Sequence, residues 1–436
     1  TDDGRMLLSS GFSGIHVVAD AGGPLRPFLT PEPDEHFHRV VALPGGRGAI
    51  LEVDPDQGVG RIEVWDGRER RTLLESASIE HYVEPGYLLF SRGGGVWALR
   101  LNRANSAPEG DPFLVVDRAT GASASPDGAL LYQVPGTYES QLIWVDREGA
   151  IQEAVASDRG AAGNPALSPD ESRIAFDGLD RIQIHAPGRG VRMPLGSPDT
   201  RQRNPAWSPE GDQLFYVTAS GPDGEGTGIR VVKAEGGTPA MVADAGYDPA
   251  VSADGRYLTY TTGDVEDRDL WYRDLRAPGS PAQQFLVGPG FHTGLRLSRD
   301  GRFAAFIAGD WAIGRFEIYL SRFPGGADRI QVSTGGVRYF SRVYWSAAGD
   351  QLYYVRESDG ALMAADVTLT PQVRLSAPRV LFTESASGLA LSDGFAVSRD
   401  PSRFLVVRRA VPHGGEATAL VLMDGWLDRA QRRATR

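Results

Sequence analysis

The sequence predicts an all-β protein, a β-propeller built from about ten four-stranded blades. Three observations predict this fold. One turn motif recurs ten times along the 436 residues, short strands rich in β-branched and aromatic residues follow the turns, and Gly (54) and Pro (29) are abundant. The turns recur about every 40 to 50 residues, which is close to the length of a four-stranded propeller blade. Helical periodicity is almost absent, so the pattern favours strands and tight turns over helices.

The repeated unit is clearest in the stretch 204–217, which reads NPAWSPEGDQLFYV, and near copies begin at Asn164 and Asp248. A first strand ends at a Ser, and a turn of Pro or a polar residue, an acid and Gly follows. Pro pre-sets φ, an acidic side chain bonds the backbone downstream, and Gly accepts a positive φ, so these residues suit a tight turn. The ten turns are TDDGR at Thr1, LPGGR at Leu43, VEPGY at Val83, SPDGA at Ser125, SPDES at Ser168, SPEGD at Ser208, SADGR at Ser252, SRDGR at Ser298, SAAGD at Ser346 and SRDPS at Ser398.

Three more strands are expected after each turn. An apolar second strand follows, such as LFYV from Leu214, then a third that ends near an acid or Arg, such as LIWVD to Asp146, and a fourth, such as RVLFTE from Arg379. A small residue stands two positions before the Ser at Ala166, Ala206, Ala250 and Ala396. We therefore expect the first strands to converge on a central axis and the aromatic residues to pack between neighbouring blades. The recurring acid of the turn is expected to serve the blade, because a residue repeated in every blade is structural.

The repeats predict three segments. Residues 1–149 form divergent N-terminal blades, the first of them incomplete, residues 150–424 form a six-repeat propeller, and residues 425–436 form a basic tail. The last repeat has a first strand GFAVS, a second FLVVRR and a third ALVLMDG but no fourth, and we expect 150–157 to supply the fourth strand and close a ring of six. One large ring of about ten blades is the alternative.

The composition narrows the class of protein. The chain has no cysteine, which excludes disulfides, thiolate metal sites and cysteine nucleophiles and fits the bacterial periplasm or exterior. The net charge of −11 argues against nucleic-acid partners. No apolar run approaches the ~20 residues that span a bilayer, so we expect no transmembrane segment in this chain. Because the chain starts at Thr1, we expect a mature or excised segment whose tether to the membrane lies elsewhere.

The repeat NPAWSPEGDQLFYV with its ending GGTPAMVAD resembles the TolB-type, WD-repeat-like β-propeller repeat. The segments QLIWVDREGAIQ, EIYLSRFPGGADRIQVSTGG and FAVSRDPSRFLVVRR are similar to the C-terminal propeller of bacterial membrane-anchored serine/threonine protein kinases. The kinase domain itself is absent, since the chain has no His-Arg-Asp loop and no Asp-Phe-Gly. The resemblance implies a propeller at the periplasmic or extracellular face of a bacterial membrane that senses or docks a partner.

Metal sites have two sets of candidates. His36 and His38 share one face of an expected strand, and with Glu35 they can form a zinc site. The acidic loops 54–58, 221–226 and 263–269 are candidates for calcium, although none has the ligand spacing of a known calcium loop. No cofactor is otherwise expected, and solvated hairpin tips and a structural histidine are the competing interpretations.

A partner surface is predicted where exposed aromatic residues and arginines lie in loops or in the tail. The candidates are Trp311, Tyr339, Phe340, Arg432 and Arg433. No Gly-x-Ser-x-Gly elbow and no His-Glu-x-x-His motif occurs, so no catalytic residue is predicted.

We therefore predict a non-enzymatic, extracytoplasmic propeller that binds a protein or ligand as a sensor or scaffold. The alternatives are an extrinsic accessory subunit that stabilises a larger bacterial membrane complex, and an enzyme with its site in the propeller channel.

Overall fold

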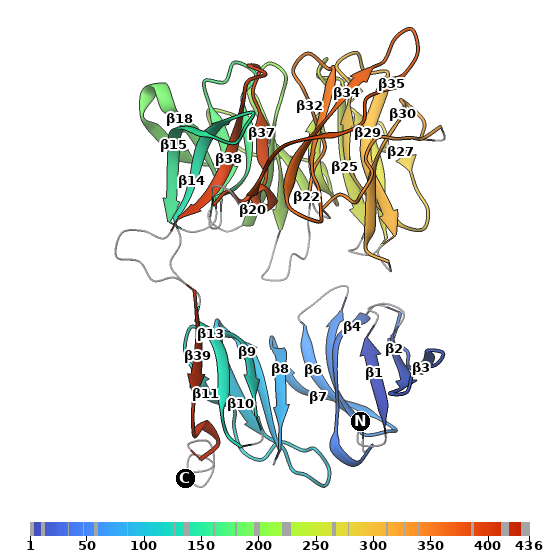
Figure 1. Ribbon diagram of the computed structural model, residues 1–436, viewed down its shortest axis with the longest axis vertical. Helices are drawn as coiled ribbons and strands as arrows, with labels where there is room; N and C mark the ends of the chain where they lie inside the picture. Colours follow the sequence, from blue (N-terminus) through green and yellow to red (C-terminus); the bar gives the residue numbers. More distant parts are fainter. Residues whose placement is uncertain are drawn as a thin grey trace. The chain divides into compact units, whose positions relative to one another are not determined.

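A computed structural model gives the fold of this chain (Figure 1). It describes all residues except 1–3, 10–13, 34, 47, 56–59, 85, 126, 135–138, 160–161, 179–180, 196–200, 220–227, 264–266, 278, 311–312, 327, 339–340, 385–387, 411–417 and 429–436. The chain divides into two compact units: unit 1 comprises Thr1–Thr137 and Gly415–Arg436, and unit 2 comprises Tyr138–Gly414. None of the helices in the described ranges has the length and apolar character needed to cross a membrane.

Unit 2 is a ring of blades, each an antiparallel sheet that we name after its first strand. Among the described residues, the first two blades are β16 (Gly163–Leu167), β17 (Ile174–Asp177), β18 (Ile182–Ala186) and β19 (Val191–Pro194), and β20 (Arg201–Trp207), β21 (Gln213–Ala219), β22 (Gly228–Lys233) and β23 (Ala240–Ala243). The next two are β24 (Tyr247–Val251), β25 (Tyr257–Gly263), β26 (Arg268–Asp274) and β27 (Gln283–Leu286), and β28 (Phe291–Leu297), β29 (Phe303–Asp310), β30 (Arg315–Arg322) and β31 (Ile330–Gln331). The last two are β32 (Tyr344–Trp345), β33 (Gln351–Val355), β34 (Ala361–Thr368), β35 (Arg374–Leu375) and β36 (Arg379–Thr383), and β37 (Phe395–Val397), β38 (Arg403–Ala410), β14 (Glu139–Asp146) and β15 (Ile151–Arg159). The predicted all-β propeller of four-stranded blades is confirmed.

The last of these blades closes the ring of unit 2 with strands from both ends of the unit. Its order is β15-β14-β38-β37, so β14 pairs with β15 on one side and with β38 on the other. The first strand β37 contacts β16 of the next blade, and β16 contacts β20 in turn. Backbone hydrogen bonds between the start and the end of unit 2 therefore hold its ring together.

Unit 1 contains the four sheets that the first four turns predict, as far as its residues are described. They are β1 (Arg5–Ser9), β2 (Ile15–Ala19) and β3 (Arg26–Leu29); β4 (Glu35–Ala42), β5 (Ala49–Pro55), β6 (Arg61–Trp65) and β7 (Arg70–Glu75); β8 (Ser78–Val83), β9 (Tyr87–Arg92), β10 (Gly95–Arg100) and β11 (Phe113–Val116); and β12 (Thr120–Ala124), β13 (Leu130–Val134) and β39 (Ala419–Met423). In the first sheet, β1 pairs with β2 as the second strand pairs with the third in the other blades.

The boundaries of these units differ from the predicted segments 1–149, 150–424 and 425–436. β39, the predicted third strand of the last repeat, pairs with β13 in unit 1 (Figure 1). The place beside β38 that was predicted for β39 is occupied by β14 in unit 2. The predicted fourth strand, 150–157, lies in β15 and does join the last blade, but next to β14. Trp426 of the predicted tail is buried in the core of unit 1. Unit 2 is thus inserted between two strands of the last sheet of unit 1.

The repeated turns have the local chemistry that the sequence predicts. In the β28 blade, Ser298 Oγ donates to Asp300 Oδ1 at 2.6 Å and accepts from the backbone N–H of Phe303 at 3.0 Å. The same serine-to-acid bond occurs at Ser168 and at Ser252. These carboxylates bind their own turns, which supports a structural role.

Candidate functional site

The centre of unit 2 is built by a β-bulge that recurs in its first strands. The bulged residues Asn164, Asn204 and Asp248 have φ of 46°, 58° and 49°, and each precedes a proline. The pairing with the second strand shifts at these places, for example between Arg203 and Ala206. Asn and Asp tolerate this left-handed backbone better than other side chains do. Because neighbouring first strands contact each other around the ring, the bulges gather polar side chains near its centre.

Asp177 links the first two bulges. It stands at the end of β17, where its Oδ2 accepts from Asn164 Nδ2 at 2.8 Å and its Oδ1 accepts from the backbone N–H of Asn204, also at 2.8 Å. Asn164 Nδ2 also donates to Asn204 Oδ1 at 3.0 Å. Burial raises the pKa of Asp177 to about 6, although these hydrogen bonds and the charges of Arg342 and Arg203 act in the opposite direction.

Asp248 holds two arginines from other blades. Arg296 of the β28 blade donates to Asp248 Oδ1 at 2.6 Å, and Arg342, which precedes β32, donates to the same oxygen at 2.5 Å. Burial works to raise the pKa of Asp248, but the two guanidinium groups outweigh it and hold that pKa below its ordinary value. Asp248 Oδ2 is buried and has no hydrogen-bond partner among the described residues.

These groups form a mixed charge cluster, which we call the central cluster: Asn164, Asp177, Arg203, Asn204, Asp248, Arg296 and Arg342. Three guanidinium groups face two carboxylates, a formal surplus of one positive charge when both carboxyls are ionised. The side chains of Arg296 and Arg342 keep 14% and 13% of their surface exposed. The central cluster can therefore present N–H donors to an acidic group that enters from solvent.

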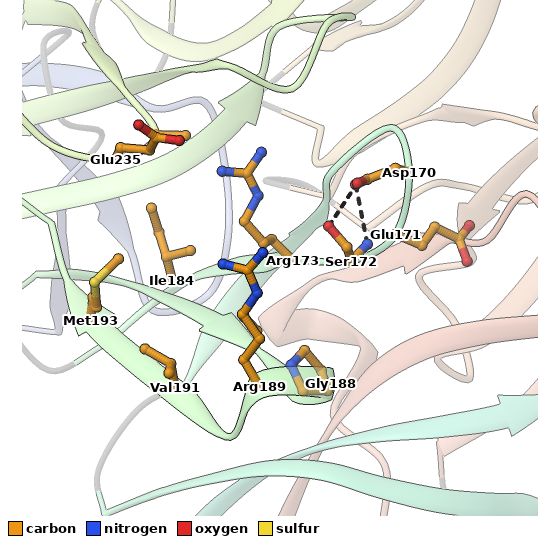
Figure 2. Close-up of a pocket in the computed structure, with 13 residues that line it drawn as sticks. Asp170, Glu171, Ser172, Arg173, Ile184, Gly188, Arg189, Val191, Met193 and Glu235 are labelled. Atoms are coloured by element: carbon orange, nitrogen blue, oxygen red, sulfur yellow. Dashed lines mark hydrogen bonds between the residues drawn. The ribbon is translucent and has the colours of Figure 1, made fainter.

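A second candidate site is a cleft of about 760 Å³ between the β16 and β20 blades (Figure 2). One wall is apolar and consists of Ile184, Val191 and Met193 from β18 and β19. Arg189 and Glu235 contribute opposite charges to its lining. The volume lies within the range that small-molecule and peptide pockets occupy.

The structure brings two of the predicted zinc ligands together and not the third. His36 Nε2 and His38 Nδ1 lie 3.7 and 3.6 Å from Asp54 Oδ2. Glu35 points to the other face of β4, since adjacent strand residues alternate, and its carboxylate pairs with Arg61 and Arg70. Among the described residues no group of three or more His, Asp or Glu side chains could hold a metal ion. The zinc site stays a prediction.

The other predicted site residues lie outside the described part of the chain. These are Trp311, Tyr339, Phe340, Arg432 and Arg433, together with the acidic loop 221–226 and the residues 56–58 and 264–266 of the other two loops. In the described part of the loop 263–269, Asp267 and Asp269 accept backbone N–H bonds from Gly290 and Gly288, and the calcium site stays a prediction. The central cluster was missed in the sequence. The sequence feature that marks the cluster is an Asn or Asp directly before the Pro of a first strand. Because this residue recurs from blade to blade, its pattern is that of a structural residue.

Comparisons with known proteins bear on the fold. No family model matches the chain, and no curated protein matches it at a significant level. Among solved structures, a TolB protein of Agrobacterium tumefaciens is 16% identical with a TM-score of 0.46, and the match covers 63% of this chain and 98% of that one. TolB of Acinetobacter baumannii is 12% identical with a TM-score of 0.43, covering 68% and 82%. These likenesses agree with the β-propeller fold that the sheets show, but they are too distant to show a family, and the link with membrane-anchored kinases stays a prediction.

The prediction that the chain is not an enzyme is corrected by the same comparison. The similar structures include an oligogalacturonate lyase in complex with manganese, at 8% identity and a TM-score of 0.42 over 87% of this chain and 96% of that one, and the tricorn protease. Both names are those of enzymes. These likenesses are distant and assign no activity to this chain, so a non-enzymatic role is not stated for it.

Proposed function

We propose that this chain is an extracytoplasmic binding module, a sensor or scaffold, in which the centre of unit 2 receives an acidic group of a ligand or partner protein. The observation that supports this proposal is that Arg296 and Arg342 both bind one oxygen of Asp248, while the charges of Arg342 and Arg203 also act on Asp177. A guanidinium group binds a carboxylate through paired N–H donors, and it does so more strongly where water is partly excluded.

The central cluster also indicates which group of the ligand lies next to its carboxylate. Asp248 Oδ2 lacks a donor among the described residues, and a ligand N–H or O–H group would satisfy it once the side chains that bury this oxygen shift aside. An aspartate side chain on a peptide backbone has both features, a carboxylate and a nearby amide N–H.

The test uses N-acetyl-L-aspartate amide and its neutral counterpart N-acetyl-L-asparagine amide as probes. Binding of the acid at about ten times its Kd should raise the Tm of unit 2 by roughly 2 °C or more, because only the folded state binds it. The neutral probe should have little effect. Arg342→Gln should abolish the shift, whereas Arg302→Gln, which changes an exposed arginine paired with Asp300, should keep it. An equal shift in the Arg342→Gln variant would contradict the proposal.

Two further measurements address location and partner. If the module is extracytoplasmic, the protein in its native host should be released with the periplasmic or surface fraction. A pull-down from native membranes separates a sensor from an accessory subunit. A sensor purifies alone and binds on signal, whereas an accessory subunit retains a partner at a fixed ratio.

A further inference from the structure

The cleft between the β16 and β20 blades adjoins an open strand edge. β19 is the terminal strand of its sheet, with the order β16-β17-β18-β19, and it pairs with β18 alone among the described strands. The backbone N–H of Leu195 donates to the carbonyl of Ile182, so alternate residues of β19 face β18 and the second edge offers the N–H and C=O of Arg192 and the C=O of Pro194 to another strand.

One face of this edge is apolar and turns toward the cleft. Ile184 pairs with Met193, and Ala186 pairs with Val191, so the four side chains lie on the same face. Val191 and Met193 are 43% and 46% exposed, while Ile184 belongs to the buried core between the two blades. The apolar packing of this core is thus left uncovered at its outer side.

The charged residues of the cleft differ in how far they are already paired. Arg173 donates to the carbonyl of Gly211 and lies over the ring of Trp207. Asp170 accepts from two serines, and Glu171 accepts from Ser398 and pairs with Arg403.

Arg189 and Glu235, in contrast, have no partner among the described residues. Figure 2 shows Arg189 before Val191 at one end of the apolar wall and Glu235 beyond Met193 at the other. The apolar wall therefore has a positive residue at one end and a negative residue at the other along the direction of β19, and the guanidinium of Arg173 lies between them in the same cleft.

We propose that this cleft binds an extended peptide of a partner protein, which adds an antiparallel strand to β19. The antiparallel direction is the more stable pairing, and alternate side chains of an added strand point to the same face. The peptide places apolar residues on Val191 and Met193. A basic residue on its N-terminal side lies near Glu235, and an acidic residue on its C-terminal side lies near Arg189.

The test measures binding of two labelled heptapeptides to the full chain by fluorescence anisotropy. The matching probe is acetyl-Lys-Thr-Leu-Thr-Val-Thr-Asp-amide, in which Lys, Leu, Val and Asp share one face. The second probe, acetyl-Asp-Thr-Val-Thr-Leu-Thr-Lys-amide, has the reverse order. The matching probe should bind about tenfold more tightly, because it forms two exposed ion pairs where the other meets two like charges.

Charge exchange in the protein makes the test specific. Arg189→Glu should weaken binding of the matching probe about tenfold. The double variant Arg189→Glu, Glu235→Arg should bind the reversed probe more tightly than the matching probe by a similar factor. Arg192→Glu is the matched control, because Arg192 lies on the opposite face of β19, over the Phe176 ring. Met193→Asp should weaken both probes.

Three results would overturn the proposal: no saturable binding of either probe up to about 1 mM, no change of preference in the double variant, or an equal loss in the Arg192→Glu control. The central cluster takes no part in this site. Excess N-acetyl-L-aspartate amide should therefore leave binding of the matching peptide probe unchanged, and the two proposals stand or fall separately.

Discussion

Asp177 shows how one buried carboxyl couples the stability of unit 2 to pH. Its pKa is about 6 in the folded protein and near the ordinary 3.8 when the chain unfolds. The folded state therefore binds the proton more tightly, and ionisation above about pH 6 costs it on the order of 3 kcal/mol. The contribution of Asp177 to stability is greatest below its unfolded pKa and falls as the pH rises through 4 to 6.

Replacing Asp177 by Asn should remove this pH dependence. When the pH is lowered from about 7.5 to 5, protonation of Asp177 should raise the free energy of unfolding of the unaltered protein by roughly 1 kcal/mol. The Asp177→Asn variant should not show this increase. Urea unfolding at the two pH values measures the difference. Asp170→Asn is the control, because the hydroxyls of Ser168 and Ser172 lower the pKa of Asp170 to about 2, so its effect falls below this range. A variant at position 177 with the full pH dependence would contradict this explanation.

Residue chemistry of this kind is only partly visible in a sequence. The bond from Ser298 to Asp300 spans two positions, so the turn pattern predicts it directly. The bond from Arg342 to Asp248 spans 94 positions and depends on the closure of a ring. Burial, which sets the pKa of Asp177, depends on the same closure.

At the scale of elements, β14 and β39 are both candidates for the third strand of the last blade, beside β38. β14 buries Leu142, Ile143 and Val145 almost completely, whereas Leu420 of β39 is 73% exposed. Both segments have a strand-like sequence, and the repeat pattern predicts β39 as the neighbour of β38. The structure gives it to β14, whose apolar residues on both faces suit a blade packed between two neighbours.

The returning segment is anchored in unit 1 by Trp426. The indole ring is buried and lies edge-on to Tyr87, with 6.0 Å between the ring centroids. Trp426→Ala should destabilise unit 1 by about 3–5 kcal/mol, the usual cost of removing a buried Trp, and leave unit 2 unaffected. Calorimetry with two resolved transitions checks this. Leu420→Ala, in the same segment but exposed, should change neither transition by more than about 0.5 kcal/mol. A joint shift of both transitions would contradict independent units.

At the scale of the whole molecule, unit 2 is an insertion in the last sheet of unit 1. The chain passes from β13 to β14, completes the ring of unit 2, and returns from β38 to β39. The ring is closed by β14 and β15 pairing with β38 and β37, all of which belong to unit 2. Its closing contacts therefore do not need unit 1.

Excised residues 138–414 should fold without the rest of the chain. The expected result is a cooperative thermal transition within a few degrees of the unit 2 transition in the intact protein, measured by circular dichroism. Residues 1–137 alone should be unstable because they lack β39 and Trp426, and joining them to 415–436 through a short Gly/Ser linker should restore folding. A non-cooperative 138–414 fragment would show that ring closure depends on unit 1.

The sequence by itself determined the class of fold, the ten turns and the structural role of their serines and acids. Each of these depends on a few neighbouring residues, whose φ preferences and side-chain hydrogen bonds act locally. The tertiary structure alone decided the exchange of β14 and β39, the meeting of three arginines with Asp177 and Asp248, and the cleft beside β19. These features depend on which distant strands become neighbours, and a repeated local pattern fits several arrangements equally well. Closing the ring selects one arrangement, since it pairs the ends of unit 2 and buries the polar side chains of its first strands together.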